Sequence, residues 1–269
     1  MKIHLLVIDP QYDFVNKAGA LSVIGAQEDM QRLAGFVDRV GSKLDDIHVT
    51  LDSHRKWHIA HAIFWKNSAG VNPSVFTTIT HSDVSNGTWM AANPRYQRWA
   101  LEYTENLEKA GKNPLMVWPE HCKIGSLGTS VDETLFKSLE KWEQENFGVV
   151  NYVTKGSNIR TEHYSAIKAD VIDPKDNTTQ LNADLIDVIS NVDKLIVCGE
   201  AKSHCVKWTL SDIVEAFATA NNNDEYVKKI VLLEDATSCI GGFEKATEDF
   251  FNKMVARGME VSTTDKYLR

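Results

Sequence analysis

Short hydrophobic runs recur along the chain and alternate with longer segments in which hydrophobic residues return every three or four positions. Several of these runs, such as the LLVI stretch at 5–8, are continuously apolar, which is typical of strands covered on both faces. We therefore expect six strands, over residues 2–9, 47–51, 115–118, 149–154, 194–199 and 229–234.

The segments between these runs have the period of amphipathic helices. One of them places five residues on a single helical face, namely Met30, Leu33, Val37, Val40 and Leu44. Another begins with Ser130 and Glu133, whose spacing predicts a capping box. Its hydrophobic face comprises Leu135, Phe136, Leu139 and Trp142. Further helices are expected near 183–190, 204–219 and 243–256, with a turn at 221–223 before the last long strand.

Strands that alternate with helices predict parallel βαβ units joined by right-handed crossovers. We therefore expect a three-layer, Rossmann-like α/β fold, in which helices flank a central and mostly parallel sheet. The whole chain, 1–269, is interpreted as a single domain, because its composition does not change along its length.

One stretch interrupts the alternation. From Lys66 to about Pro94 the chain is rich in Asn, Ser, Thr and Gly, with scattered aromatic residues. A loop of this length inside a domain is usually a lid, a binding loop or an interface element. We interpret this stretch as such an element, and its aromatic residues could supply a homo-oligomer interface.

Composition narrows the classes of function. The chain has 269 residues, of which 43% are hydrophobic, and a formal net charge of −8 without any run of Lys or Arg, which argues against a nucleic-acid partner. No apolar stretch approaches the roughly 18 residues of a membrane span, and Asp9 and Pro10 come too early for a signal peptide. The four cysteines lack CxxC spacing, so we expect a protein of the reducing cytoplasm.

Three potentially reactive side chains follow three different predicted strands. Taken singly, Asp9 would be a turn cap, Lys155 a surface residue and Cys205 an inert buried thiol. In a parallel sheet, however, the carboxyl ends of the strands meet at one edge, where ligands bind. Cys205 falls in the first turn of a predicted helix with Ser203 as its expected N-cap, where the helix dipole favours a thiolate. Lys155 would lower the thiol pKa further, and Asp9 would accept and return the proton.

A second group of residues has the character of metal ligands. Asp52 and His54 are two positions apart, so an extended backbone places both side chains on the same face. His58 and His61 follow closely, and His121 comes just after the strand expected at 115–118. One carboxylate with two or more imidazoles suits a first-row divalent metal, although each histidine alone would more often lie in a surface loop.

Six motifs together resemble one family. LLVIDPQYDF, DSH, WPEHC, VTKGSN, EHYSA and GEAKSHCVKWT occur in the order seen in the isochorismatase-like cysteine hydrolases, with the nicotinamidases as the nearest branch. The chain departs from many members at Lys202 and Ser203, where those have Thr-Asp. The resemblance covers nearly the whole chain and implies a central parallel sheet flanked by helices. Compared with compact members of the family, the chain has a longer loop at about 66–114, which we interpret as an inserted loop or lid over the pocket.

The resemblance also implies roles for individual residues. It assigns Asp9, Lys155 and Cys205 as the catalytic triad. It assigns Asp52, His54 and His121 as the metal ligands, with either His58 or His61 as an additional one. It implies a cis peptide between Glu200 and Ala201, with an oxyanion hole formed by the N–H groups of Ala201 and Cys205. Aromatic walls for a flat substrate ring would come from Phe14, Trp118 and Tyr164.

These implications lead to an expected reaction. The protein would hydrolyse nicotinamide to nicotinate and ammonia through a Cys205 thioester, as a step of NAD salvage. It would need one divalent metal ion, most simply zinc, with iron or manganese as alternatives. Two other readings stay open, namely hydrolysis of another small amide or ureido compound with a structural metal, and a non-catalytic binding module. A dinucleotide-binding oxidoreductase is disfavoured, because the first strand leads into DPQYDF instead of a glycine-rich turn.

Overall fold

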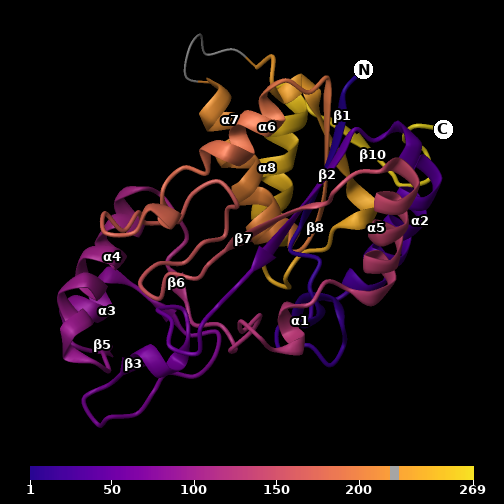
Figure 1. Cartoon of the computed structure of the whole chain (residues 1–269). Coiled ribbons are helices and arrows are strands. Elements are labelled where there is room, and N and C mark those ends of the chain that lie inside the picture. Colours follow the sequence, from indigo (N-terminus) through magenta and orange to yellow (C-terminus); the bar gives the residue numbers. More distant parts are fainter. Residues whose placement is uncertain (219–223) are drawn as a thin grey trace.

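The computed structural model describes residues 1–218 and 224–269 as a three-layer α/β structure (Figure 1). Its central sheet has six strands, all paired in parallel, in the order β10-β9-β8-β1-β2-β7. The strands are β1 (Ile3–Ile8), β2 (Asp46–Asp52), β7 (Asn151–Lys155), β8 (Lys194–Gly199), β9 (Ile230–Leu233) and β10 (Glu260–Ser262). The predicted three-layer fold is confirmed.

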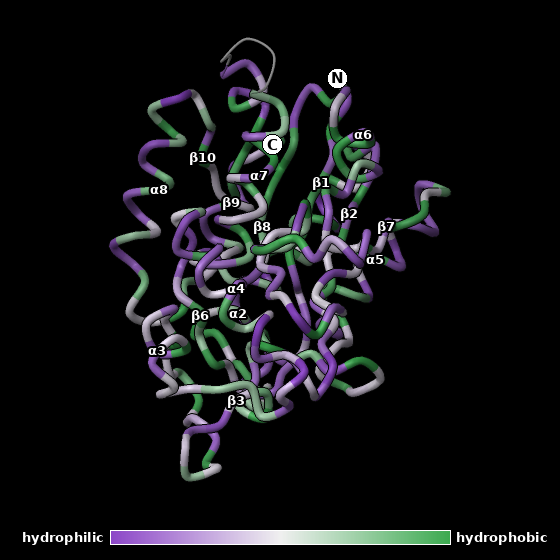
Figure 2. Tube along the Cα trace, turned by 90° about the vertical axis from the view of Figure 1, so that its left-hand side faces the viewer, coloured by the Kyte–Doolittle hydropathy of each residue, from purple (hydrophilic) through white to green (hydrophobic). Residues whose placement is uncertain are grey.

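Alternate residues of β1 separate the two hydrophobic cores. Leu5 and Val7 belong to a core covered by helices α2 (Ala26–Val40) and α5 (Glu133–Asn146). Leu6 and Ile8 belong to the other core, which is covered by α6 (Ala183–Ser190), α7 (Lys207–Ala218) and α8 (Glu244–Ala256). The hydropathy colouring reflects this burial, with hydrophobic colour along the central strands and an alternating pattern along α8 (Figure 2). Both faces of the sheet are therefore covered, as continuously apolar strands require.

The region expected to be an inserted loop contains regular structure. It holds β3 (Trp65–Lys66), β4 (Thr78–Ile79), α3 (His81–Ser85), β5 (Met90–Ala91) and α4 (Gln97–Lys109). Strands β3 and β5 form one small antiparallel sheet, and β4 pairs with β6 (Leu115–Met116) in another. In Figure 1 this part lies at the end of the molecule opposite the two termini. We call residues 62–116 the insertion.

Two strand predictions need correction. The strand expected at 115–118 does not join the central sheet, because β6 pairs with β4 and the Trp118 N–H donates to the Ala60 carbonyl at 2.8 Å. The sixth strand is instead β10, which has only three residues and is too exposed to show the hydrophobic pattern of a buried strand. The expected turn at 221–223 and the end of the expected helix at 219 lie outside the described residues.

Helix starts and faces also differ in detail. Helix α5 is capped by the Asp132 side chain, which accepts from the N–H groups of Thr134 and Leu135, so the expected Ser130–Glu133 capping box is wrong. Phe136 is 39% exposed, one position off the buried stripe of this helix. A short helix, α1 (Tyr12–Val15), follows β1. Among the described residues, none of the helices combines the length and the hydropathy that crossing a membrane requires.

Candidate active site

The carboxyl ends of four strands bring the predicted reactive residues together. Asp9 directly follows β1, Asp52 ends β2 and Lys155 ends β7, where it lies opposite Asp52 in the strand register. Cys205 lies in a π-helical turn, residues Lys202–Val206, between β8 and α7. Because β1 lies between β2 and β8, these side chains converge at the middle of one sheet edge.

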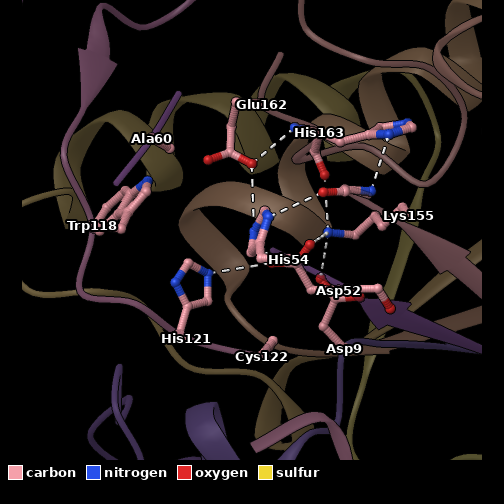
Figure 3. Close-up of polar contacts among 12 residues, drawn as sticks. Asp9, Asp52, His54, Ala60, Trp118, His121, Cys122, Lys155, Glu162 and His163 are labelled. Atoms are coloured by element: carbon pink, nitrogen blue, oxygen red, sulfur yellow. Dashed lines mark hydrogen bonds and ion pairs between the residues drawn. The ribbon is translucent and has the colours of Figure 1, made fainter. Parts of the chain in front are cut away.

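Lys155 is the centre of this group (Figure 3). Its Nζ lies 2.8 Å from Asp9 Oδ2 and 3.3 Å from Asp52 Oδ1. It also lies 3.6 Å from the Cys205 sulfur and donates a hydrogen bond of 2.9 Å to the His163 carbonyl oxygen. The structure therefore brings together Asp9, Lys155 and Cys205, all of them buried.

The surroundings set the protonation of this group. Burial raises the pKa of the Cys205 thiol well above its usual range, although Lys155 opposes the shift. The expected thiolate is therefore wrong for the free protein, because burial and the two neighbouring carboxylates outweigh one ammonium. Burial also raises the pKa of Asp9, against the lowering effect of Lys155. A thiol beside a carboxylate of raised pKa suits proton transfer at the moment of attack.

Thr50 fixes one oxygen of the Asp9 carboxylate. The Asp9 N–H donates to Thr50 Oγ1 at 3.0 Å, and the Thr50 hydroxyl donates back to Asp9 Oδ1 at 2.5 Å. Since Oδ1 is held in this way, Oδ2 is the oxygen that contacts Lys155. The sequence did not single out Thr50, because one threonine inside an apolar strand has no distinctive pattern.

The turn between β8 and Cys205 is tightly constructed. Gly199 has φ +105°, and a Cβ at this position would lie 2.1 Å from the Ile8 carbonyl oxygen, so strands β8 and β1 approach closely here. The peptide bond between Glu200 and Ala201 is cis. Ser203 is not the expected N-cap: its Oγ contacts His204 Nδ1 at 2.9 Å and accepts from the Ile240 N–H. The π-helical turn replaces the first α-turn and leaves Ser203 facing the loop of Ile240.

The predicted metal ligands also come together. Asp52 Oδ2 lies 2.9 Å from His54 Nε2 and 3.3 Å from His121 Nε2. The other ring nitrogens contact backbone carbonyls, His54 Nδ1 that of Gly156 at 3.1 Å and His121 Nδ1 that of Pro119 at 2.8 Å. These carbonyls require an Nδ1 proton on each ring, so the Nε2 lone pairs face the carboxylate, which is the usual arrangement of zinc-binding histidines.

Two lone pairs facing a carboxylate need a cation or a proton between them. A proton on His54 can fill this place, since Asp52 Oδ2 lies within hydrogen-bond distance of its Nε2. Burial lowers and Asp52 raises the pKa of His54, with a net rise to about 8. Burial by itself would raise the pKa of Asp52, but His54 and Lys155 lower it more strongly and hold it well below its usual range. The donor set of Asp52, His54 and His121 therefore fits a divalent metal ion.

Of the two candidate extra ligands, His61 has the free nitrogen. His58 Nε2 contacts the Thr161 carbonyl at 3.1 Å, and its Nδ1 accepts from the Ala60 N–H at 3.2 Å, so both nitrogens are used. His61 Nδ1 contacts the Lys56 carbonyl at 3.1 Å, while its Nε2 has no hydrogen-bond partner among the described residues. The rings of His61 and His54 lie 5.4 Å apart between centroids.

Two residues of the motif DPQYDF hydrogen-bond to the backbone at or next to the predicted metal ligands. The Gln11 side chain accepts from the Asp52 N–H at 2.7 Å and donates to the Asp52 carbonyl at 2.8 Å. The Asp13 carboxylate accepts from the N–H of Cys122, the residue after His121, at 2.7 Å. Sequence reasoning missed both roles, although DPQYDF contains each residue, because their partners are more than forty positions away.

A small pocket lies between the reactive group and the metal ligands. Its lining includes Cys205, Ala201, Asp52 and His121, together with the expected aromatic residues Phe14, Trp118 and Tyr164. The Trp118 Nε1–H donates to the Tyr164 hydroxyl at 2.8 Å. The pocket encloses about 20 Å³, which is room for about one water molecule.

His204 and Glu162 also line this pocket and were not predicted. The ring of His204 meets Trp118 edge-on at 5.3 Å between centroids. Burial and Lys207 lower the pKa of His204 to about 4, so the ring is neutral and serves as an aromatic wall. Glu162 Oε1 lies 3.8 Å from His54 Nε2, beside the metal ligands. His204 stands in the motif GEAKSHCVKWT directly before Cys205, and Glu162 begins the motif EHYSA. Their positions within these motifs were the sequence signal that could have identified them.

No protein-family model and no curated protein matches the chain, whereas solved structures do. A nicotinamidase and pyrazinamidase from Acinetobacter baumanii is similar, with a TM-score of 0.65 and 19% identity, covering 99% of this chain and 98% of that one. A yeast nicotinamidase bound to the inhibitor nicotinaldehyde has a TM-score of 0.65 at 18% identity, covering 97% and 99%. A pyrazinamidase of Pyrococcus horikoshii in complex with zinc has a TM-score of 0.55 at 17% identity, covering 98% and 99%.

At these identities the likeness establishes the fold. The chain folds as the nicotinamidases and the isochorismatase-like hydrolases do, and the resemblance drawn from six short motifs is confirmed at that level.

Proposed function

We propose that this protein is a metal-dependent cysteine amidohydrolase that converts nicotinamide and water to nicotinate and ammonia. One observation carries the proposal: a single ammonium, Lys155 Nζ, lies 2.8 Å from a carboxylate and 3.6 Å from a thiol in the wall of a pocket that also contains metal-type ligands. The triad, the metal and the substrate are each part of the proposal.

The first half of the reaction forms the thioester. The Cys205 sulfur attacks the carboxamide carbon while Asp9 takes the thiol proton, which explains why a neutral thiol suffices in the free protein. Negative charge then develops on the carboxamide oxygen, where the N–H groups of Ala201 and Cys205 would stabilise it. Asp9 returns the proton to the amide nitrogen, so ammonia leaves and the acyl group remains on sulfur.

The second half regenerates the thiol. Asp9 takes a proton from a water molecule, whose oxygen attacks the thioester carbon. The carbon–sulfur bond breaks, Asp9 returns its proton to the Cys205 sulfur, and the product leaves as the carboxylic acid, which ionises to nicotinate in water. Throughout both halves Lys155 holds Asp9 in place and balances the negative charge of Asp9 and Asp52, because it contacts both carboxylates.

Asp52, His54 and His121 would hold the metal ion, with His61 as a further ligand. When bound, the ion would supply a Lewis-acidic position that binds a ring nitrogen or water and so orients the substrate. Zinc suits this donor set best, and iron or manganese would also be accepted by it. The neighbouring pyrazinamidase that is a zinc complex supports this assignment.

The substrate is assigned from the walls of the pocket. Phe14, Trp118, Tyr164 and His204 present flat aromatic surfaces, and a planar heteroaromatic ring packs well between such surfaces. The nicotinamidase neighbours, one of them bound to nicotinaldehyde, support a ring of this size. Nicotinate production would place the protein in NAD salvage.

Ammonia release from a panel of amides, combined with elemental analysis, tests the proposal. We expect about one metal ion per chain, fastest turnover on nicotinamide or pyrazinamide, and loss of turnover after chelation with recovery on adding zinc. Preference for an aliphatic amide or a ureido compound, with turnover that survives complete metal removal, would favour the second reading, in which the metal is structural. No turnover on any amide by the metal-loaded protein would overturn the enzymatic proposal.

A further inference from the structure

A second buried acidic group lies beside the nucleophile turn and has no part in the proposed reaction. Glu200 precedes the cis peptide and is fully buried, and its carboxyl group lies beside that of Asp29 in α2, with Oε1 free of any hydrogen bond among the described residues. Ser238 joins the two: its N–H donates to Glu200 Oε2 at 3.2 Å, and its hydroxyl donates to Asp29 Oδ2 at 2.5 Å. Three distant segments therefore meet at this pair of acids.

The charges around the pair do not balance if both acids are ionised. Arg32 contacts Asp29 Oδ1 at 2.5 Å and makes the only ion pair with either carboxyl group among residues 1–218 and 224–269. The other titratable groups that face the pair are acidic or neutral, namely Asp235 beyond Arg32, and the thiols of Cys198 and Cys239. One cation for two buried carboxyl groups requires one proton between them.

Glu200 is the acid that keeps the proton. Burial, and then the neighbouring Asp29, raise the pKa of Glu200 well above its usual range. Asp29 has a partner at each oxygen, since Oδ1 contacts Arg32 and Oδ2 accepts from the Ser238 hydroxyl. A neutral Glu200 can donate to that carboxylate, whereas an ionised Glu200 would repel it.

The acid pair is continuous with the pocket. The Lys202 N–H donates to the Ser238 carbonyl at 2.8 Å, which ties the nucleophile turn to the 238–240 loop. Two residues later in that loop, the Ile240 N–H donates to Ser203 Oγ at 3.1 Å. Ala201, Ile240 and Cys205 all line the pocket. A shift of Ser238 would therefore move both walls that flank the sulfur.

We propose that Glu200 is a positioning residue, a neutral acid whose proton donated to Asp29 locks the Ala201–Cys205 turn and the Ile240 loop in register. The activity readouts below rest on the proposed function, but Cys205 alkylation does not. A shift of about 1 Å in an attacking atom costs on the order of a hundredfold in rate, so the lock has a measurable consequence although Glu200 touches no reacting atom.

Two substitutions at one position separate positioning from bulk stability. Glu200→Gln retains a neutral side chain with a donor toward Asp29, whereas Glu200→Ala removes the donor and leaves a cavity. Asp170→Asn is the matched control, because Asp170 is another buried acid, whose pKa burial raises to about 7, and its ion-pair partner is Lys112 at 3.8 Å and no residue of this turn. Each variant is assayed well below its own melting temperature for kcat, KM and the rate of Cys205 alkylation by iodoacetamide.

We expect Glu200→Ala to lower kcat and the alkylation rate at least tenfold, and Glu200→Gln to recover most of both. Asp170→Asn should change the melting temperature without changing alkylation. A folded Glu200→Ala protein with wild-type kcat and alkylation, or a Glu200→Gln protein as impaired as Glu200→Ala, would overturn the inference. If no amide is hydrolysed by the wild type, the proposed function fails while the alkylation rates still decide the inference.

The pH dependence of stability gives a second readout. An acid whose folded pKa lies above its unfolded pKa favours folding at low pH, and this contribution is lost as the pH rises toward the folded pKa. The melting temperature of the wild type should therefore fall relative to that of Glu200→Gln between pH 5 and pH 9. Parallel curves for the two proteins would show that Glu200 is ionised and would also overturn the inference.

Discussion

Two polar clusters lie side by side at the carboxyl edge of the sheet, and they are built in opposite ways. In the cluster around Lys155, the ammonium already contacts two carboxylates, a carbonyl oxygen and a thiol. In the cluster of His54, His61 and His121, backbone carbonyls occupy each Nδ1, and the Nε2 atoms of His54 and His121 face Asp52. The first cluster contains its own permanent cation, whereas the second needs a proton or a metal ion between its rings and the carboxylate.

Asp52 belongs to both clusters, since one oxygen contacts Lys155 and the other faces the two histidines. Under the proposed function, one cluster would carry out the bond-making and the other would hold an ion, and Asp52 is the carboxylate through which the two would influence each other. Each prediction below tests one side of that division.

The largest effect is expected at the sulfur. Cys205→Ala should reduce amide turnover by at least a thousandfold, because no other group in the pocket can form the acyl intermediate, while metal content and melting temperature stay close to those of the wild type. Ammonia release and elemental analysis on the same preparation provide the measurement. Cys239→Ser is the matched control and should keep its activity. Substantial turnover by Cys205→Ala would exclude the covalent route.

A smaller effect should separate the two histidines next to the metal ligands. His61→Asn removes a free Nε2 and is expected to weaken metal binding at least tenfold, a loss typical of disturbed metal sites. His58→Asn should leave the metal affinity within about threefold, because both nitrogens of His58 already bond to the backbone. Competition with a coloured chelator measures both affinities. The reverse order, with His58→Asn the weaker binder, would move the additional ligand from His61 to His58.

The smallest effect concerns a histidine pair far from the pocket. Asn151 donates to His48 Nδ1 at 3.1 Å, His48 Nε2 contacts His4 Nδ1 at 2.9 Å, and His4 Nε2 lies 3.2 Å from Asp46. Burial, together with His4, lowers the pKa of His48 to about 4. The folded state therefore binds fewer protons than the unfolded state below pH 6.5, and stability decreases as the pH falls toward 4.

His48→Gln should remove about 1–2 kcal/mol of that acid-induced loss and leave turnover at pH 7 unchanged. Denaturant unfolding at pH 7 and at pH 4.5 gives the two free energies. His81→Gln, a histidine outside both clusters, is the control and should show the wild-type difference. Equal pH dependence in His48→Gln and the wild type would contradict the assigned hydrogen-bond direction.

Much of the fold could be predicted because the strands of the central sheet are continuously apolar. The same signal failed at residues 115–118, since an apolar run of four residues reads alike in a central sheet and in a two-stranded ribbon. It also failed at β10, whose Glu260, Val261 and Ser262 are partly exposed at the sheet edge. The insertion was taken for a loop because of its Asn-, Ser-, Thr- and Gly-rich stretch at 66–94, and α4, which follows that stretch and buries Ala100, Tyr103 and Leu107, was missed with it.

The reactive residues were predictable because strand ends converge in a parallel sheet, so Asp9, Asp52 and Lys155 follow from topology. The residues that orient them, Gln11 and Thr50, could not be predicted, because their hydrogen bonds join distant parts of the chain and leave no pattern in the sequence. The protonation of Cys205 was predicted wrongly for a related reason. Helix position is visible in a sequence, whereas the burial that raises the thiol pKa is visible only in the assembled pocket.

The size of the pocket has a kinetic consequence. A space that admits about one water molecule is smaller than an aromatic amide, so under the proposed function the walls of the pocket would have to move for the substrate to enter. The hydrogen bond that joins Trp118 to Tyr164 links two of those walls, so it would have to break for their rings to separate. The rate of substrate binding would then be limited by the frequency of that opening rather than by diffusion. Bulky amides would be excluded at the entry step, before the chemical step.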